Sequence, residues 1–177
     1  MDIKFMPILN TLEKTINYLA KSGYQIGKLR AIYAEHYVAS RLATLFPQLG
    51  EDRCVKSADI YLAAINKRVE VKATQKGSFC LEGADWCWAI NPEQLKKRKF
   101  DYCVMIGFDD KEPLKIVKEL VFSYNDFGGE PSEREDFMHE SAGLCYYSEG
   151  YSGSLTRLER KLREHPNSYE ARYDRIE

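Results

Sequence analysis

The sequence lacks the signals of an exported, membrane or zinc-binding protein. Its five cysteines, from Cys54 to Cys145, are an odd number and never stand at CxxC spacing, so neither a disulfide framework nor a zinc knuckle is indicated. Residues 1–7 lack the basic segment and apolar run of a secretory signal, and no stretch is long enough to span a bilayer. We therefore expect reduced thiols in a cytoplasmic protein with no membrane segment.

An excess of charge of one sign is also missing. The 26 Lys and Arg residues stand against 27 Asp and Glu residues, so phosphate binding would have to come from a local patch. The 177 residues are 44% hydrophobic and 30% charged, which is typical of a globular protein that folds around its own core. We expect residues 1–177 to form a single domain with its core at about residues 27–123.

Helical periodicity marks two segments near the beginning. Apolar residues at positions 8, 12, 16 and 19 predict a helix within residues 7–22, with Gly23 as its C-terminal stop. A second helix is predicted over about residues 28–46, where Pro47 ends an apolar stripe. The stripe consists of Ala31, Val38, Leu42 and Leu45. Glu35 falls on this stripe, so its carboxylate would be buried at a cost unless a partner or a metal satisfies it.

The middle of the chain is typical of strands. A strand-rich region is predicted to begin at residues 53–55. The pattern that follows predicts a hairpin with strands at residues 59–65 and 68–74 and a turn near residues 65–67. Further strands are predicted at 79–81, 86–90, 102–108 and 120–122, the first two as a hairpin or a sheet edge. A basic helix is predicted over 91–100, and a helix over 155–164 in a C-terminal extension of about residues 154–177. The expected class is α/β, with a central mixed sheet flanked by helices.

The tripeptide Glu70-Val71-Lys72 lies within the second predicted strand, where alternate side chains share a face. An acidic residue two positions before Lys also occurs at residues 2–4, 109–111 and 159–161, so the pattern alone is weak. Only this copy lies mid-strand, follows an acid at Asp59 in the same hairpin, and comes after a helix with a carboxylate on its apolar stripe. These coincidences favour a site over the alternative, a solvated Glu–Lys pair on an exposed strand face.

The hairpin register decides whether Asp59 and Glu70 can meet. A tight turn at Asn66 and Lys67 would place Asp59 about 13 Å from Glu70 along the ladder, too far to share a metal. A turn centred on residues 65–66 pairs Asp59 with Lys72 and brings Glu70 within roughly 7 to 8 Å of Asp59. We predict this second register or a bulged equivalent, with all three side chains on one face.

Such a set suits a hard divalent cation. Mg²⁺, with Mn²⁺ as a substitute, takes one or two carboxylates together with water and substrate phosphate. Asp59 and Glu70 would supply the carboxylates, and the backbone carbonyl of Val71 would complete the shell. Lys72 would orient the attacking water and neutralise charge on the phosphate oxygens.

The order of a helix, Asp59, Glu70-Val71-Lys72 and Gln75 resembles the PD-(D/E)xK nuclease superfamily, which includes restriction endonucleases and Holliday-junction resolvases. The resemblance covers roughly residues 27–108, and the sequence departs from the motif where Ala58 stands in place of Pro. It implies a restriction-endonuclease-like core of a helix, a three-stranded meander, a helix and a strand. It also implies catalytic roles for Glu35, Asp59, Glu70 and Lys72.

DNA contacts are expected from basic and amide side chains beyond this centre. The candidates are Gln75, Lys76, Lys96, Lys97, Arg98 and Lys99. A Gln at a strand end is also typical of a surface residue, and a charge run on a short helix is often only a solvated face. Trp86 and Trp88 share a strand face, which suits core or dimer packing more than base stacking.

The function expected from the sequence is therefore Mg²⁺-dependent cleavage of DNA phosphodiester bonds. Restriction-type cleavage of duplex DNA by a homodimer is the first interpretation, because two active sites are needed to cut two strands. Cleavage of branched or repair intermediates is the second. A DNA-binding module that keeps the fold without turnover is the third.

Overall fold

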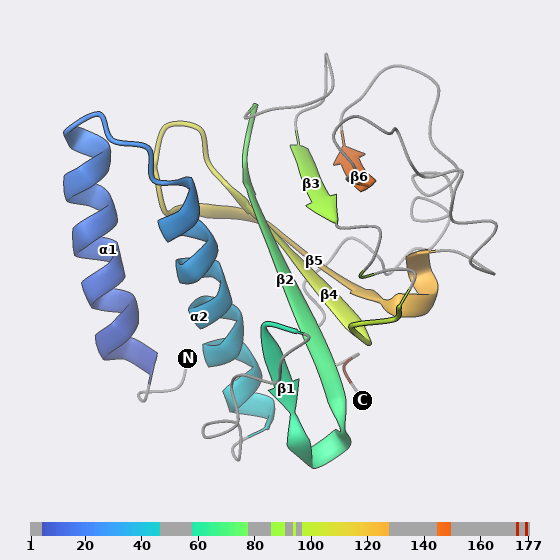
Figure 1. Ribbon diagram of the computed structural model, residues 1–177. Helices are drawn as coiled ribbons and strands as arrows, with labels where there is room; N and C mark the ends of the chain where they lie inside the picture. The colour runs from blue at the N-terminus through green and yellow to red at the C-terminus, as the bar shows by residue number, and fades with distance from the viewer. Residues whose placement is uncertain are drawn as a thin grey trace.

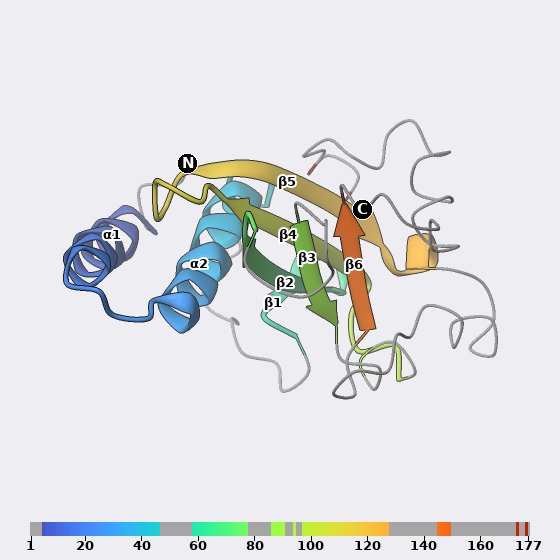
Figure 2. The same cartoon turned by 90° about the horizontal axis from the view of Figure 1, so that it is seen from above.

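A computed structural model describes residues 5–46, 58–77, 86–90, 94, 97–127, 145–149, 173 and 176 of the chain. These parts contain two α-helices, α1 (Met6–Lys21) and α2 (Gly27–Leu45). A larger sheet consists of β1 (Ile60–Leu62), β2 (Lys67–Gln75), β4 (Tyr102–Phe108) and β5 (Ile116–Ser123), and a smaller one of β3 (Trp86–Ile90) and β6 (Cys145–Glu149). The helix α2 lies against one face of the larger sheet with α1 beside it, and β3 and β6 lie on the other face (Figures 1 and 2). The expected α/β class is confirmed.

The first helix ends where the sequence predicts. Gly23 has a φ of +78°, a left-handed conformation that glycine adopts at little cost. The N–H of Tyr24 then bonds back to the carbonyl of Leu19 at 3.0 Å, which closes the helix end. Its buried side is formed by Leu9 and Ile16, whereas Ile8 is 42% exposed. Of the predicted stripe, Ile16 is buried and Leu12 and Leu19 are partly buried, so the prediction is wrong only for Ile8.

The second helix packs its small residues onto the larger sheet. Val38 and Leu42 are buried as predicted, together with Ala34, Ala39 and Ala43. Leu45, expected on the same stripe, is 47% exposed because it is the last residue of the helix. Pro47, the predicted helix stop, lies outside the described residues.

The larger sheet has the strand order β1-β2-β4-β5, and only β2 and β4 are parallel among these neighbours. The predicted strand at 102–108 is confirmed and has both faces buried. Val104, Ile106 and Phe108 belong to the core under α2, whereas Cys103 and Met105 belong to the core under β3. The last strand, β5, is longer than the predicted 120–122 and runs antiparallel along β4.

The tryptophans of β3 form the second core. Trp86 and Trp88 are 8% and 1% exposed, and their rings stack with centroids 5.9 Å apart. The indole N–H of Trp88 donates to the carbonyl of Ile106 at 3.0 Å. Both tryptophans therefore pack in the core of the chain, as one of the sequence interpretations predicts. The run at 79–81, expected to pair with this strand, lies outside the described residues, and β3 pairs with β6.

The predicted basic helix does not reach residue 100. Gln94 is helical, but Lys97 and Arg98 form a turn, and Arg98 has a φ of +44°. The N–H of Lys99 bonds to the carbonyl of Gln94, five residues back rather than four, so the helical hydrogen-bond pattern has ended there. The guanidinium of Arg98 lies 5.1 Å from the ring centre of Tyr124.

Tyr173 is held on the helical side of the larger sheet by a carboxylate of β5. Glu119 of β5 accepts hydrogen bonds from the hydroxyls of Tyr37 and Tyr173, at 2.8 and 3.0 Å. The helix predicted at 155–164 lies outside the described residues. In the described parts of the chain, none of the helices has the length and apolar character that a membrane crossing requires.

Candidate active site

The hairpin that carries the candidate residues turns through a short 3-10 helix, Ala63–Ile65, followed by Asn66 in a left-handed conformation. This turn takes up four residues, so β1 ends at Leu62 and pairs it with Lys67, while Ile60 pairs with Val69. The predicted pairing of Asp59 with Lys72 is therefore wrong by two positions. A register shift of two residues leaves every side chain on the same face of the sheet. Continuing the pairing one residue beyond Ile60 and Val69 places Asp59 beside Glu70.

The strand β2 has an open edge beyond this pairing. Among the described residues, β1 covers only Lys67–Val69 of that edge, while β4 continues along the other side as far as Gln75. Asp59 reaches the open edge, where its Oδ2 accepts a hydrogen bond from the N–H of Val71 at 2.7 Å. Because the N–H and C=O of one strand residue point to the same side, the carbonyl of Val71 also faces this edge.

Glu70 and Lys72 form the buried half of the site. Glu70 is only 3% exposed, and its Oε1 accepts hydrogen bonds from the ammonium of Lys72 and from Nε2 of Gln94, the latter at 2.7 Å. Both side chains lie on the face toward β3, where Cys103 and Met105 are their neighbours on β4. A carboxylate so deeply buried requires such partners.

The electrostatics of the site are dominated by carboxylates. Burial first, then the charges of Asp59 and Glu70, raises the pKa of Glu35 to about 7, and Lys72 only partly offsets this. Burial and Glu70 also raise the pKa of Asp59, although the Val71 N–H opposes the shift. Three carboxylates thus surround one ammonium, and the negative charge is incompletely balanced.

Lys72 remains a cation in this environment. Burial alone lowers its pKa, but the charge and hydrogen bond of Glu70, with Asp59 behind it, outweigh burial and leave the pKa above its ordinary value. Its ammonium therefore donates hydrogen bonds at neutral pH and does not serve as a base.

The donor set suits a hard divalent cation in its chemistry. Asp59, Glu70 and the Val71 carbonyl offer oxygen ligands, and the surplus negative charge favours a cation. Within the described residues, however, no three His, Cys, Asp or Glu side chains stand close enough together to hold a metal. Glu70 is turned to Lys72 and Gln94, so it would have to redirect an oxygen toward the open edge.

Most of the expected DNA-contact residues do not gather at this centre. Gln75 lies on the helical face of β2, where its amide oxygen accepts a hydrogen bond from Arg30 and its amide nitrogen donates to the carbonyls of Asp109 and Asp110. Lys76 is exposed, one position further along the chain.

Of the basic run, Lys97 and Arg98 are exposed and Lys99 is partly buried. Lys96 lies outside the described residues. Whether any of these side chains binds DNA stays a prediction.

Two residues of this region were not found from the sequence. Gln94 reaches Glu70 across 24 positions, and its only signal was its place in the first turn of a predicted helix. Arg30 bonds to Gln75 at 2.5 Å and to the carbonyl of Pro113 at 2.9 Å, contacts that periodicity cannot reveal.

Comparison with models of protein families finds no match to this chain, and comparison with curated proteins finds no significant match. The interpretation of the site therefore depends on its own geometry and charge.

Proposed function

We propose that this protein is a Mg²⁺-dependent nuclease that hydrolyses phosphodiester bonds of DNA and has a restriction-endonuclease-like core. The observation that carries the proposal is that Asp59, bound to the Val71 N–H at the open edge of β2, lies close enough to the Glu70–Lys72 pair for both charges to act on its pKa. Elements separated in the chain supply these groups, and Glu35 of α2 is close enough for its pKa to respond to all three.

The charges support a reaction on a phosphate that needs a divalent cation. A phosphodiester is an anion and would be repelled by the three carboxylates unless a cation lies between them. When bound, Mg²⁺ supplies a Lewis acid for the phosphate oxygens and a more acidic water.

Each side chain then has a defined task. Asp59, Glu70 and the Val71 carbonyl would hold the cation through their oxygens, and Glu35 would add negative charge behind them. The ammonium of Lys72 donates hydrogen bonds to the attacking water or to a phosphate oxygen and balances charge as it develops. The water oxygen gives up a proton to solvent and bonds to phosphorus, one phosphorus–oxygen ester bond breaks, and the leaving oxygen takes up a proton from solvent, so the products are a phosphate end and a hydroxyl end.

Within this proposal, restriction-type cleavage of duplex DNA by a homodimer is the first form. A two-fold dimer supplies one active site for each strand. Cleavage of branched or repair intermediates by the same centre is the alternative form. A four-way junction and a linear duplex of the same sequences separate the two, since preferential cutting of the junction would reject the first form.

The decisive experiment follows supercoiled plasmid with purified protein in Mg²⁺, Mn²⁺ and EDTA. Nicked and linear products are expected only with a metal, and Lys72→Ala should slow their formation about 100-fold or more. The control is Lys115→Ala, which removes an ammonium that also pairs with a glutamate, Glu112, but on an exposed surface. It should cleave like wild type.

The same assay contains the results that reject the proposal. Cleavage that survives EDTA would reject the metal. Equal rates for wild type and Lys72→Ala would reject this centre. DNA binding without any nicking at high protein concentration would favour the non-catalytic module.

A further inference from the structure

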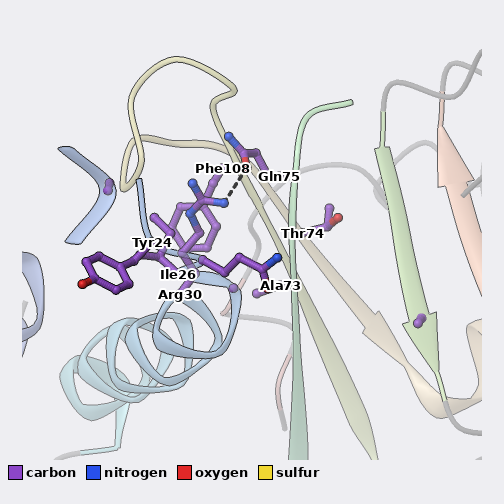
Figure 3. A pocket seen from close by; sticks show the side chains of 11 residues that line it. Tyr24, Ile26, Arg30, Ala73, Thr74, Gln75 and Phe108 are labelled. Carbon is purple, nitrogen blue, oxygen red and sulfur yellow. Dashed lines mark hydrogen bonds between the residues drawn. The ribbon is translucent and has the colours of Figure 1, made fainter. Parts of the chain in front are cut away.

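A second feature of the molecule lies beside the candidate centre. A cleft of about 640 Å³ opens between the start of α2 and the ends of β2 and β4. We call it the Arg30 cleft, after the charged residue in its wall; Figure 3 shows Arg30 reaching from α2 to Gln75. The cleft also adjoins Thr74, which is two residues beyond Lys72 on the same face of β2 and so about 7 Å away.

Arg30 is a partly buried cation in the wall of this cleft. Its hydrogen bonds go to the carbonyl of Pro113 and the amide oxygen of Gln75, both neutral. Among the described residues it has no carboxylate partner. A guanidinium has five N–H donors, so these two bonds leave further donors for a ligand. Burial lowers its pKa, and no acidic side chain in the described part of the chain offsets this.

The beginning of α2 adds positive potential to the same cleft. Ile26 caps the helix without a side-chain hydrogen bond, and the first turn has no acidic residue. The N-terminus of a 19-residue helix presents free N–H groups that attract anions. Gly27 leaves this end open, because a Cβ added there would meet nothing within 4 Å. Two separate sources of positive charge therefore meet in one cleft.

The size and remaining lining of the cleft indicate more than a simple anion. A phosphate alone would occupy a small part of about 640 Å³. Ala20, Ala73 and Tyr24, the last 65% exposed, provide accessible apolar surface in the wall of the cleft, and apolar surface of this kind suits the flat face of a nucleobase. A base that stays paired within a duplex cannot enter a cleft.

We propose that the Arg30 cleft binds an unpaired nucleotide of the DNA strand next to the cleaved position. Its phosphate contacts Arg30 and the start of α2, and its base lies against Tyr24 and Ala73. The inference rests on the proposed function, because the neighbouring position on the strand is defined by Lys72. The unpaired nucleotide comes either from a single-stranded end or from a base extruded from a duplex, and the substrates below distinguish these sources.

The test measures binding with the Lys72→Ala protein in EDTA, so that no cleavage occurs. Fluorescence anisotropy compares a labelled single strand, a fully paired duplex and a duplex with one mismatch. Isothermal titration compares thymidine monophosphate with thymidine. We expect the monophosphate to bind and thymidine to bind about tenfold or more weakly, since charge-assisted hydrogen bonds are lost. Preference for the single strand identifies a strand end, and preference for the mismatch identifies extrusion.

Variants separate the cleft from general charge attraction. Arg30→Gln should weaken binding of the monophosphate and of the preferred DNA at least about tenfold, and Arg30→Lys should restore part of it. Lys28→Gln removes the same charge from an exposed position two residues away and should change binding less than about twofold. Thermal unfolding of each variant confirms that it is folded. Equal losses for Arg30→Gln and Lys28→Gln, or no preference for the monophosphate, would overturn the inference.

Failure of this inference differs from failure of the nuclease proposal. Cleavage that depends on Mg²⁺ and Lys72 but is unchanged in Arg30→Gln rejects the cleft and leaves the nuclease. Arg30-dependent binding of the monophosphate by a protein that cuts no DNA rejects the nuclease and leaves a nucleotide site.

Discussion

Asp59 holds the backbone of Val71: its carboxylate accepts the N–H of Val71 at 2.7 Å, at the point where β1 stops covering β2. The carboxylate therefore satisfies an edge amide that would otherwise face the site without a strand partner. It also brings a second negative charge beside Glu70, and both burial and this repulsion raise the pKa of Asp59. The same side chain thus has a structural and a proposed catalytic role.

Two substitutions of Asp59 separate these roles. Asp59→Asn keeps an oxygen that can accept the Val71 N–H but removes the charge, so its stability should stay within about 0.5 kcal/mol of wild type or rise slightly. Asp59→Ala leaves the amide without its acceptor and should cost about 1–2 kcal/mol in urea unfolding. Both should lose metal-dependent cleavage. An active Asp59→Asn protein would show that the carboxylate is only structural.

The shared face of the candidate residues was predictable because the alternation of side chains along a strand is a local property. Glu70 and Lys72 share a face for any strand that contains them, and an even shift in register preserves the face of Asp59. The same locality explains the success at Gly23 and at the buried strand β4. Each of these features is decided by a few adjacent residues.

The register and the long-range contacts were not predictable for the opposite reason. The turn through Ala63–Ile65 contains no Gly or Pro to announce it, so the strand was extended to Ile65. The pairing of Trp86 with Glu149 joins segments far apart in the chain, and no local pattern specifies such a partner. Contacts such as Gln94 with Glu70 depend on the final packing of the layers.

Gln94 gives a prediction about metal requirement. Its Nε2 donates to Oε1 of Glu70 at 2.7 Å and so helps to fix that carboxylate. Gln94→Ala should raise the Mg²⁺ concentration for half-maximal cleavage about tenfold, with much of the rate recovered at saturating Mg²⁺. Gln94→Asn, one methylene shorter, should behave similarly because it cannot span the same distance. A lower maximal rate with an unchanged Mg²⁺ requirement would exclude this positioning role.

Glu35 gives a prediction about stability and pH in the absence of metal. Its pKa is about 7 in the folded protein, above its ordinary value of 4.5. The folded state therefore binds the proton more tightly, and the resulting stabilisation is complete below pH 4.5 and is lost as the pH rises through 7. In EDTA, Glu35→Gln should match wild type near pH 4.5 and exceed it at pH 8, by on the order of 1 kcal/mol after solvent screening.

Urea unfolding across this pH range checks the prediction, with Glu112→Gln, at an exposed glutamate, as the control whose difference from wild type should stay flat. Saturating Mg²⁺ at pH 8 should stabilise wild type and reduce the advantage of Glu35→Gln. A difference that does not change with pH would mean that Glu35 titrates normally and is not part of the carboxylate cluster.

Gly107 shows how closely the β3 layer packs over the larger sheet, and it gives the last prediction. A Cβ at this position would lie 2.6 Å from Cζ3 of Trp86 and 2.8 Å from Cβ of Lys118. Because Trp86 is buried and stacked on Trp88, its ring cannot move freely, and Gly107→Ala should cost about 1–3 kcal/mol in urea unfolding. The near-ultraviolet signal of the Trp pair should change as well.

Gly27→Ala adds the same methyl group in open space and should leave stability unchanged or raise it by up to about 1 kcal/mol. Equal stability of the two variants would mean that β3 does not rest on β4 as closely as these distances require.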